Sequence, residues 1–536
     1  HGGQRVDRGV AVLTQSSNMA INITMQRRGL PLAYVATAGN QAQLGVARIG
    51  AALLEDDRVT ALGLHVEGVG DLRAFEAMAQ RARDLGKPVV VLKSGRSAQA
   101  RVAAVSHTAS LTGSDAGARA LLRRLGIAQV DSLPSLLETL KLLHFAGPLP
   151  SNRVVSMSCS GGEASLMADT ATGRDVVFPP LSAEQREGLR AVLGPMVALA
   201  NPLDYHTYIW TDVPRMAATF AAAMAGDTAL GCLIADFPRE DRCDTAAWEC
   251  LFEAGARAVQ AAGKPLAVVA TLPDAMSEAV AERIAAQGMI PLHGLDEALC
   301  AIAAAARIGA PRPPAAPLLL PGSPRRPSTL SEAEAKAALA DYGVTVPRAR
   351  RAETETELAT ATRAIGLPLV IKAEGLAHKT EAGGVAFARD AESLRAARGA
   401  ARAMPCKGWL VEEMIGDVVA ELLVGVVRDP AHGLKLTLAA GGTLTELIGD
   451  AVSLLLPVTE GEIEDALDRL RIAPMLDGHR GRPGANRAAI ARAVLAVQTY
   501  VEAHAARLDE VEINPLLCTP DRAVAADALI RIGDRT

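Results

Sequence analysis

Hydrophobic positions in the first 310 residues alternate between short β-branched runs and longer stretches with helical periodicity. The short runs predict buried strands at Val10–Leu13, Ala33–Thr37, Ala61–Val66, Pro88–Leu92, Arg153–Met157, Leu230–Ala235 and Leu266–Ala270. Helical patterns lie between and after them, such as Leu72–Leu85 and the alanine-rich segment around Leu295–Arg307. Because strands that alternate with helices form parallel sheets with helices on both faces, this pattern predicts an α/β fold with two doubly wound parallel sheets.

A proline-rich segment separates this region from the rest of the chain. Seven of the 17 residues in 311–327 are proline, a density that sustains neither helix nor sheet. Directly after it, Ser331 and Glu334 have the spacing of a capping box, which predicts the start of a helix. Longer strands at Trp409–Met414 and Val418–Val427 indicate an α+β domain. The expected divisions are domains at 1–147 and 148–310, a linker at 311–328 and a third domain at 329–536.

Composition narrows the classes of partner. The 536 residues carry 55 Lys and Arg against 60 Asp and Glu, so the net charge is −5, which argues against nucleic acid or an anionic membrane as the main partner. Only 3% of residues are aromatic, too few for the stacking surfaces of RNA-binding sheets. No apolar run reaches the 18 residues of a membrane helix. The seven cysteines form no CxxC pair, so we expect reduced thiols in a cytoplasmic protein.

A histidine lies in a loop of small polar residues at 106–114, after a strand that ends near Lys93. In doubly wound sheets ligands bind at the carboxyl ends of the strands, and an imidazole there can act as a nucleophile toward phosphorus or a carbonyl carbon. This makes His107 a candidate catalytic residue, and Glu67, at the end of its own strand, can hydrogen-bond an imidazole. The alternative is an ordinary structural histidine and a solvated glutamate.

Two strand-to-helix turns can supply an anion site for such a histidine. They are Thr14–Asn18 and Ser158–Gly162. Free backbone N–H groups at a helix start, together with hydroxyls or glycines, hold phosphate. The candidate phosphate-binding residues are Ser16, Ser17, Ser160, Gly161 and Gly162.

The third domain carries positions suited to a nucleotide. A strand at 368–372 ends in Lys372, and a loop with Gly383 and Gly384 follows, an arrangement that suits nucleotide phosphates. Further along, Glu412 and Met414 lie in a segment that can form an adenine hinge. The next strand carries Glu421, which completes the candidate ATP-binding residues.

Three oxygen donors near the carboxyl terminus suggest a metal site. Glu512 and Asn514 are two residues apart in an extended segment, so they share one face, and Asp527 follows on a facing strand. Hard oxygen ligands of this kind suit Mg²⁺ bound to nucleotide phosphates. With the preceding positions, they predict an ATP-grasp domain that binds ATP and Mg²⁺.

These motifs, in this order, resemble the NDP-forming acyl-CoA synthetases, the family of ADP-forming acetyl-CoA synthetase that is related to succinyl-CoA synthetase. The similarity extends from Arg8 to about Ile532. The matching segments are SHTASLTGSD at 106–115, GGEASLMAD at 161–169, NPLDYH at 201–206, PLVIKAEGLAHKTEAGGV at 368–385 and EINPLL at 512–517.

The resemblance implies flavodoxin-like folds for the two parallel sheets and a role for each candidate residue. It implies that His107 carries a phosphoryl group, that Glu67 orients it, that the two turns cradle the phosphohistidine and that His378 is a second phosphate acceptor near the nucleotide. The implied reaction joins a carboxylic acid to CoA through an acyl phosphate, with conversion of ATP to ADP and phosphate. The expected partners are therefore a small carboxylic acid and CoA as co-substrate, and the chain is expected to form a homodimer.

The sequence departs from the family pattern at three places. The usual asparagine-containing turn of the second sheet reads Ser158–Gly162, and Ala109 replaces a frequent glycine. Family members with this domain order begin with a Rossmann-type CoA-binding domain, which the sequence before Arg8 does not contain. We therefore expect this chain to phosphorylate its histidine but to bind CoA poorly without that domain.

The sequence does not identify the carboxylic acid substrate. Tyr205, Tyr208 and Trp210 cluster in a chain poor in aromatics, which suggests either a pocket wall for an aromatic or betaine-like acid or a packed loop corner. Two alternative functions also remain: an enzyme that activates the acid for another outcome such as lyase chemistry, and a non-catalytic acyl-CoA or nucleotide sensor. The presence of His107 favours the ligase over the sensor.

Overall fold

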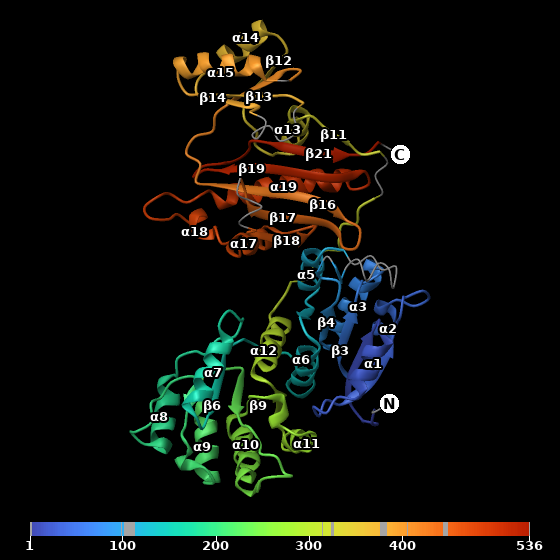
Figure 1. Ribbon diagram of the computed structural model, residues 1–536, viewed down its shortest axis with the longest axis vertical. Helices are drawn as coiled ribbons and strands as arrows, with labels where there is room; N and C mark the ends of the chain where they lie inside the picture. The colour runs from blue at the N-terminus through green and yellow to red at the C-terminus, as the bar shows by residue number, and fades with distance from the viewer. Residues whose placement is uncertain are drawn as a thin grey trace. The chain divides into compact units, whose positions relative to one another are not determined.

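The computed structural model describes residues 3–97, 99–100, 113–313, 315–322, 326–375, 383–404, 406–442 and 449–534. The chain divides into two compact units, His1–Ala315 and Ala316–Thr536 (Figure 1). The predicted residues His107 and His378 lie outside the described residues.

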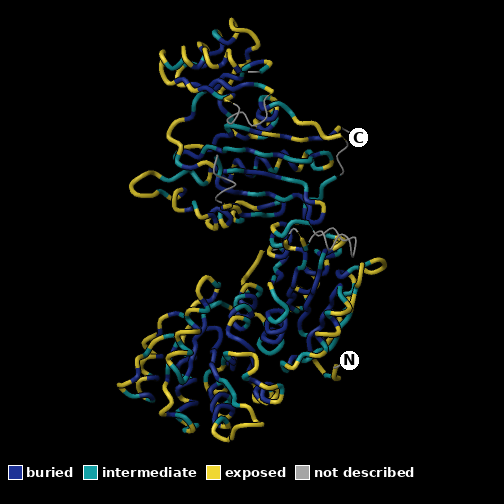
Figure 2. The backbone as a smooth tube through the Cα atoms, viewed as in Figure 1, coloured by how far each residue is buried: buried dark blue, intermediate teal, exposed yellow. Residues whose placement is uncertain are grey.

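The first sheet of unit 1 is parallel, with the order β2-β1-β3-β4-β5. Its strands are β1 (Gly9–Thr14), β2 (Leu32–Thr37), β3 (Val59–Val66), β4 (Val89–Lys93) and β5 (Ala128–Val130). Its helices are α1 (Ser17–Thr24), α2 (Val46–Leu54), α3 (Leu72–Asp84), α5 (Asp115–Arg124) and α6 (Leu133–Ala146). Every residue of β1 and β4 is buried, as expected for strands covered on both faces (Figure 2).

The second sheet of unit 1 is also parallel and repeats this connectivity, in the order β10-β9-β8-β6-β7. Its strands are β6 (Val154–Ser158), β7 (Leu203–Asp204), β8 (Leu230–Ile234), β9 (Leu266–Ala270) and β10 (Ile290–His293). Its helices are α7 (Gly161–Ala171), α8 (Ala183–Leu193), α9 (Val213–Met224), α10 (Glu249–Ala262), α11 (Glu278–Ala286) and α12 (Leu295–Gly309). The prediction of two doubly wound parallel sheets is confirmed.

The two parallel sheets share a hydrophobic core, because α6 from the first packs against α12 from the second. Within this core lies an ionic network. The fully buried carboxylate of Glu138 contacts Arg28 Nη1 at 2.8 Å and Lys141 Nζ at 2.9 Å, and accepts a hydrogen bond from the backbone N–H of His293 at 3.0 Å. Because His293 ends β10, this network joins elements of both sheets.

Unit 2 contains two sheets whose strand pairs are antiparallel. The larger sheet has the order β11-β21-β19-β16-β17-β18, with β20 paired to β19. Its strands are β11 (Ser328–Thr329), β16 (Ala420–Asp429), β17 (Gly433–Ala440), β18 (Ala451–Leu455), β19 (Leu508–Cys518), β20 (Ala523–Ala525) and β21 (Ala528–Ile532). The smaller sheet, in the order β12-β15-β13-β14, consists of β12 (Ala349–Ala352), β13 (Leu369–Ala373), β14 (Val385–Ala388) and β15 (Trp409–Glu413).

Helices of unit 2 pack against its sheets. They are α13 (Glu332–Ala340), α14 (Glu355–Ile365), α15 (Ala391–Ala403), α17 (Glu460–Asp468), α18 (Ala473–Leu476) and α19 (Arg487–His504). Along β16, Leu422, Val424 and Val426 are fully buried in the core that includes α19, so the intervening residues face the opposite side. The predicted capping box at Ser331 and Glu334 is present at the start of α13.

The second half of the proline-rich segment packs on unit 2. Leu318 is buried, and the N–H of Leu319 donates to the carbonyl of Leu456 at 2.8 Å. A Cβ at Gly322 would lie 2.1 Å from the carbonyl oxygen of Ala506, so only glycine permits this approach. The segment is therefore anchored before residue 328, where the sequence analysis ended the linker. In the described part of the chain, no helix is long and apolar enough to cross a bilayer.

Candidate functional site

The carboxyl edge of the first sheet holds a polar network centred on His65, at the end of β3. Its Nδ1 lies 2.8 Å from Thr14 Oγ1 and its Nε2 lies 2.8 Å from Ser94 Oγ. Burial lowers the pKa of His65, with the Glu67 carboxylate opposing the shift, so the neutral ring is favoured. His65 was not predicted from the sequence, because the strand around it is almost uniformly hydrophobic.

The backbone around Glu67 is held by two further buried side chains of this edge. Gln15 Oε1 accepts hydrogen bonds from the N–H groups of Glu67 at 2.6 Å and Gly68 at 3.2 Å. Lys93 Nζ donates to the carbonyl oxygen of Glu67 at 2.7 Å. The half-buried Glu67 is therefore placed rigidly at the predicted ligand-binding edge.

The first predicted phosphate turn is continuous with this network. Thr14 Oγ1, which contacts His65, accepts a hydrogen bond from the N–H of Ser16 at 3.0 Å. Ser16 is the N-cap of α1, where its hydroxyl accepts from Met19 N at 3.3 Å, and Ser17 is exposed in the first turn. No acidic residue occurs in that turn, so the positive end of the α1 dipole favours an anion there.

The second predicted phosphate turn has a different electrostatic setting. Ser160 caps α7 without a side-chain capping bond, and Gly161 and Gly162 form the first turn. A Cβ at Gly161 would lie 3.1 Å from Asp204 Oδ2, so a carboxylate lies against this helix start. Burial, Asp236 and Asp204 raise the pKa of Glu163 in the same turn. These acidic groups disfavour a phosphate at α7 in comparison with α1.

The three aromatic residues proposed for the acid have different neighbours. Tyr205 is fully buried and packs edge-on against Phe220 in the core, with ring centroids 5.3 Å apart. Tyr208 is half-exposed and donates its hydroxyl to the carbonyl of Leu193 at 2.7 Å. Trp210 packs edge-on against Trp248 at 5.8 Å. The three rings therefore differ in burial: Tyr205 belongs to the core, Trp210 packs against that core, and Tyr208 is half-exposed.

In unit 2, Lys372 on β13 lies in a buried ionic cluster. Its Nζ contacts Glu332 Oε1 at 2.9 Å, Glu412 Oε2 at 3.0 Å and the carbonyl oxygen of Ala526 at 2.6 Å. Burial alone would lower the pKa of Lys372, but the Glu332, Glu412 and Asp527 carboxylates raise it above its ordinary value. The ammonium donates hydrogen bonds to Glu332 and Ala526 and forms an ion pair with Glu412.

A second lysine, Lys336 on α13, completes the cluster. It pairs with Glu332 at 2.7 Å and with Glu412, and it donates to the carbonyl of Ala526 at 3.2 Å. Lys372 and Glu412 were predicted from the sequence as ATP-binding residues. Glu332 and Lys336 were not, because they follow the capping serine with the spacing of an exposed helical ion pair. The cluster links the small sheet, α13 and the segment before β21.

Glu421 and Asn514 converge on the glycine pair that follows β17. The N–H of Gly441 donates to the carbonyl of Glu421 at 2.7 Å, and the N–H of Gly442 donates to Asn514 Oδ1 at 3.3 Å. Gly442 has a φ of +86°, and a Cβ there would lie 2.5 Å from Glu421 Oε2. A side chain at position 442 would therefore displace the Glu421 carboxylate.

The predicted metal ligands Glu512 and Asn514 lie on β19, and Asp527 lies directly before the paired strand β21, not on it as predicted. Glu512 pairs in register with Leu529, and the N–H of Asn514 donates to the carbonyl of Asp527 at 3.3 Å. Burial, Glu510 and Asp527 raise the pKa of Glu512, and its side-chain hydrogen bond with Asn514 opposes the shift. A divalent cation relieves the repulsion between carboxylates that share a site. This set of oxygen donors therefore fits Mg²⁺. Among the described residues, no three His, Cys, Asp or Glu side chains form a metal-binding group by themselves.

The remaining predicted nucleotide residues lie beside the small sheet. Gly384 accepts a hydrogen bond from Ala373 N at 2.8 Å through its carbonyl, and Gly383 has a φ of +67°. The N–H of Met414 donates to the carbonyl of Pro368 at 3.0 Å, which fixes the segment after β15 against the start of β13.

Comparison with known proteins gives two family matches and several relatives. The family of ATP-grasp domains matches residues 324–532, and the succinyl-CoA ligase-like flavodoxin domain matches residues 7–143. A trans-feruloyl-CoA synthase from an unknown prokaryotic organism is 26% identical over 550 residues, which cover 98% of this chain and 76% of that protein. The beta subunit of ADP-forming acetate–CoA ligase I from Pyrococcus furiosus is 30% identical over 210 residues, which cover 37% of this chain and 90% of the subunit.

Solved structures give a further likeness. The dinucleotide-forming acetyl-coenzyme A synthetase 1 of Ca. Korarchaeum cryptofilum, in complex with coenzyme A, Ca-AMPCP and HgCl⁺, has 29% sequence identity and a TM-score of 0.36. The match covers 38% of this chain and 93% of that one.

Proposed function

Because this chain belongs to the NDP-forming acyl-CoA synthetases, we propose that it is an ATP-dependent, ADP-forming acid–CoA ligase. In the proposed reaction, the imidazole of His107 attacks the γ-phosphorus of ATP and ADP leaves. The carboxylate of the acid then attacks the phosphohistidine, which forms an acyl phosphate and frees the imidazole. The thiolate of CoA attacks the acyl carbon and releases phosphate.

The observation that carries the proposal is the proximity of Lys372 to Asp527. These two residues, 155 positions apart in the sequence, were predicted separately as a nucleotide ligand and a metal ligand, and the Asp527 carboxylate raises the pKa of Lys372. A buried lysine that stays charged beside oxygen donors for a divalent cation is suited to the polyphosphate of ATP. The proposed ATP contacts are Lys372, Gly383, Gly384, Glu412, Met414 and Glu421.

Glu512, Asn514 and Asp527 are the proposed Mg²⁺ ligands. When bound, the cation neutralises charge on the β- and γ-phosphate oxygens. Two of these side chains, Glu512 and Asn514, are on β19, and Asp527 directly precedes β21. The N–H of Gly442 donates to the amide oxygen of Asn514 at 3.3 Å.

At the carboxyl edge of the first sheet, Ser16 and Ser17 are the proposed contacts of the phosphohistidine. Glu67 is the proposed residue that orients the His107 imidazole, and its backbone is fixed by Gln15 and Lys93. His378 is proposed as a second phosphate acceptor near the nucleotide. Ser160, Gly161 and Gly162 remain proposed contacts as well, although Asp204 disfavours a phosphate at that helix.

A hydroxylamine trap tests the proposed function without requiring CoA. Hydroxylamine converts an acyl phosphate to a hydroxamate, so the full chain is incubated with ATP, Mg²⁺, hydroxylamine and, in turn, acetate, succinate, 4-hydroxybutyrate, ferulate and a betaine. We expect equal amounts of ADP and hydroxamate with at least one acid, and loss of both in His107→Ala. Release of AMP and pyrophosphate would contradict the proposal. In a second reaction with CoA in place of hydroxylamine, product identification distinguishes a ligase, which releases acyl-CoA, from an enzyme that converts the activated acid to another product.

A further inference from the structure

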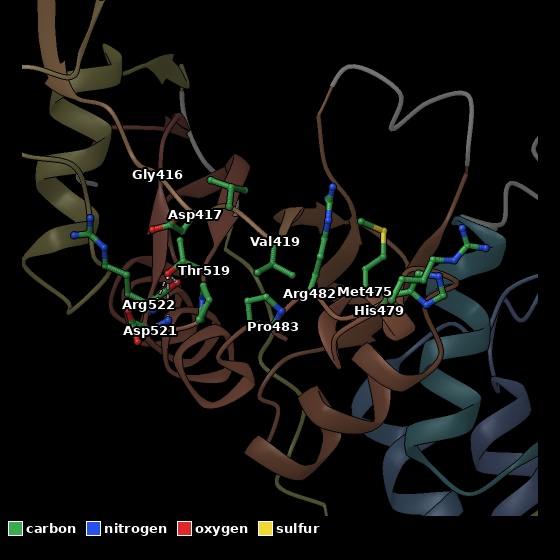
Figure 3. A pocket seen from close by; sticks show the side chains of 13 residues that line it. Gly416, Asp417, Val419, Met475, His479, Arg482, Pro483, Thr519, Asp521 and Arg522 are labelled. Carbon is green, nitrogen blue, oxygen red and sulfur yellow. Dashed lines mark hydrogen bonds between the residues drawn. The ribbon is translucent and has the colours of Figure 1, made fainter. Parts of the chain in front are cut away.

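A cavity of about 860 Å³ lies in unit 2, outside the proposed nucleotide and metal residues. Three segments line it: residues 416–419 after β15, the turn 519–522 between β19 and β20, and the loop after α18. Figure 3 shows Asp417, Thr519 and Arg522 on one side and Met475, His479 and Arg482 on the other. None of the proposed ATP or Mg²⁺ ligands lines this cavity.

The loop after α18 presents three basic side chains to the cavity. His479, Arg480 and Arg482 make no side-chain hydrogen bond or ion pair with the described part of the chain. The nearby carboxylate of Asp477 forms an ion pair with Arg487 at 2.7 Å. Arg487 also pairs with the carboxylates of Glu464 and Asp468. The guanidinium groups at 480 and 482 therefore remain available to a ligand.

This basic loop has a defined backbone. Gly478 has a φ of +97°, and a Cβ there would lie 2.9 Å from the carbonyl oxygen of Arg482. The N–H of Arg482 donates to the carbonyl of His479 at 3.1 Å, which closes a turn. Arg480 adopts a φ of +51°, in a region that a residue with a side chain rarely occupies. The loop thus forms a closed turn, and its residues 479–483 are exposed to solvent at the rim of the cavity.

Both sides of the cavity carry apolar side chains. Met475, on α18 beside the basic loop, and Val418, in the segment after β15, have 46% and 39% of their surface exposed. The carboxylates of Asp417 and Asp521 line the side opposite the basic loop. An anionic group would therefore bind toward the basic loop, with an apolar body against Met475.

We propose that this cavity is a binding site for an organic phosphate that carries an apolar or aromatic body. The planar guanidinium groups of Arg480 and Arg482 match the oxygens of a phosphate, which can accept two parallel hydrogen bonds from each. The volume lies within the range of small-molecule pockets and exceeds what inorganic phosphate alone would fill. This site is additional to the proposed ATP site and does not depend on the ligase reaction.

Isothermal titration of the full chain with phenyl phosphate tests the proposal. The titration is made with saturating ADP and Mg²⁺ present, and inorganic phosphate, benzoate and phenol are the comparison ligands. The test variant is Arg480→Gln/Arg482→Gln. The control Arg471→Gln/Arg492→Gln removes the same charge from two exposed arginines of this unit outside the cavity.

We expect one phenyl phosphate to bind per chain, at least tenfold more tightly than each comparison ligand. The test variant is expected to lose at least tenfold in affinity, and the control is expected to bind like the wild type. Three results would overturn the proposal: no saturable binding, equal losses in both variants, or loss of binding when ADP is added, which would assign the ligand to the nucleotide site. An unchanged circular dichroism spectrum of the test variant confirms that its fold is intact.

Discussion

Lys372 Nζ lies 3.0 Å from Glu412 Oε2, and both side chains are buried where the small sheet of unit 2 meets α13 and the segment before β21. The same ammonium donates hydrogen bonds to Glu332 Oε1 at 2.9 Å and to the carbonyl oxygen of Ala526 at 2.6 Å. The Lys372 charge is therefore shared among two carboxylates and a carbonyl. A nucleotide phosphate at this lysine would compete with these acceptors for its N–H groups.

The substitution Lys372→Met tests the contribution of this cluster. Removing one partner of a buried ion pair typically costs 3–5 kcal/mol, so we expect the free energy of unfolding to fall by about 3 kcal/mol. ATP affinity is expected to fall at least tenfold, as measured by titration calorimetry. Lys372→Arg, which keeps the charge, should recover most of the stability. The exposed Lys407→Met is the matched control, and equal ATP affinity in the Lys372→Met and Lys407→Met variants would refute a nucleotide role.

The substitution Gly442→Ala tests the convergence of Glu421 and Asn514. The added methyl group would meet Glu421 Oε2 at 2.5 Å, and the φ of +86° disfavours alanine. We expect a tenfold or greater loss of Mg·ATP affinity in a fluorescent-nucleotide displacement assay. Gly399→Ala, where a Cβ meets no atom within 4 Å on helix α15, is the control and should leave affinity unchanged. Equal Mg·ATP affinities of the Gly442→Ala and Gly399→Ala variants would show that Gly442 does not contribute to nucleotide binding.

The stability of unit 1 is expected to fall at acidic pH because of Glu138. Burial alone would raise its pKa, but Lys141, His293 and Arg28 outweigh burial and lower the pKa from 4.5 to about 2. A carboxyl group whose pKa is lower in the folded state stabilises the fold fully above its unfolded pKa, and this contribution is lost as pH falls from 4.5 toward 2.

Urea unfolding of Glu138→Gln between pH 6 and pH 3 measures this contribution. We expect the variant to be less stable by about 3 kcal/mol at pH 6 and to show a weaker loss of stability on acidification than the wild type. The control Glu253→Gln removes an exposed partner of Arg257 and should change stability by less than about 1 kcal/mol. Parallel pH profiles for wild type and Glu138→Gln would contradict the assignment.

The aromatic segment provides a prediction about the acid. If Trp210 contacts the acid, Trp210→Ala should lose the increase in melting temperature that a bound acid produces in the wild type. A thermal-shift panel of acetate, succinate, aromatic acids and betaines measures this, and Tyr208→Ala reports on the exposed neighbour. Equal shifts in the wild type and Trp210→Ala would favour the packed loop corner.

Strands and their connections could be predicted from hydrophobic pattern, because buried parallel strands such as β1 and β4 are continuous apolar runs. The same pattern placed Lys372 near the end of a strand, and its contact with a nucleotide stays a prediction. The Lys336–Glu412 contact could not be predicted from the sequence, because it joins residues 76 positions apart that share no local pattern.

The aromatic cluster shows a second limit of the sequence. Its three members lie within six positions, but His206 has a φ of +61° and the short helix Thr207–Ile209 follows it. This backbone path sends Tyr205 into the core and leaves Tyr208 half-exposed. Spacing along the chain therefore could not show which rings face a common space.

Transfer of labelled phosphate to the protein is the direct test of the proposed phosphohistidine. The full chain is incubated with γ-labelled ATP and Mg²⁺, and the label is followed after treatment with acid and with base. We expect a phosphate that is stable in base and labile in acid, present in the wild type and in the control His504→Ala, and absent from His107→Ala/His378→Ala. A wild type without label, or full labelling of the double variant, would contradict a phosphohistidine at these positions.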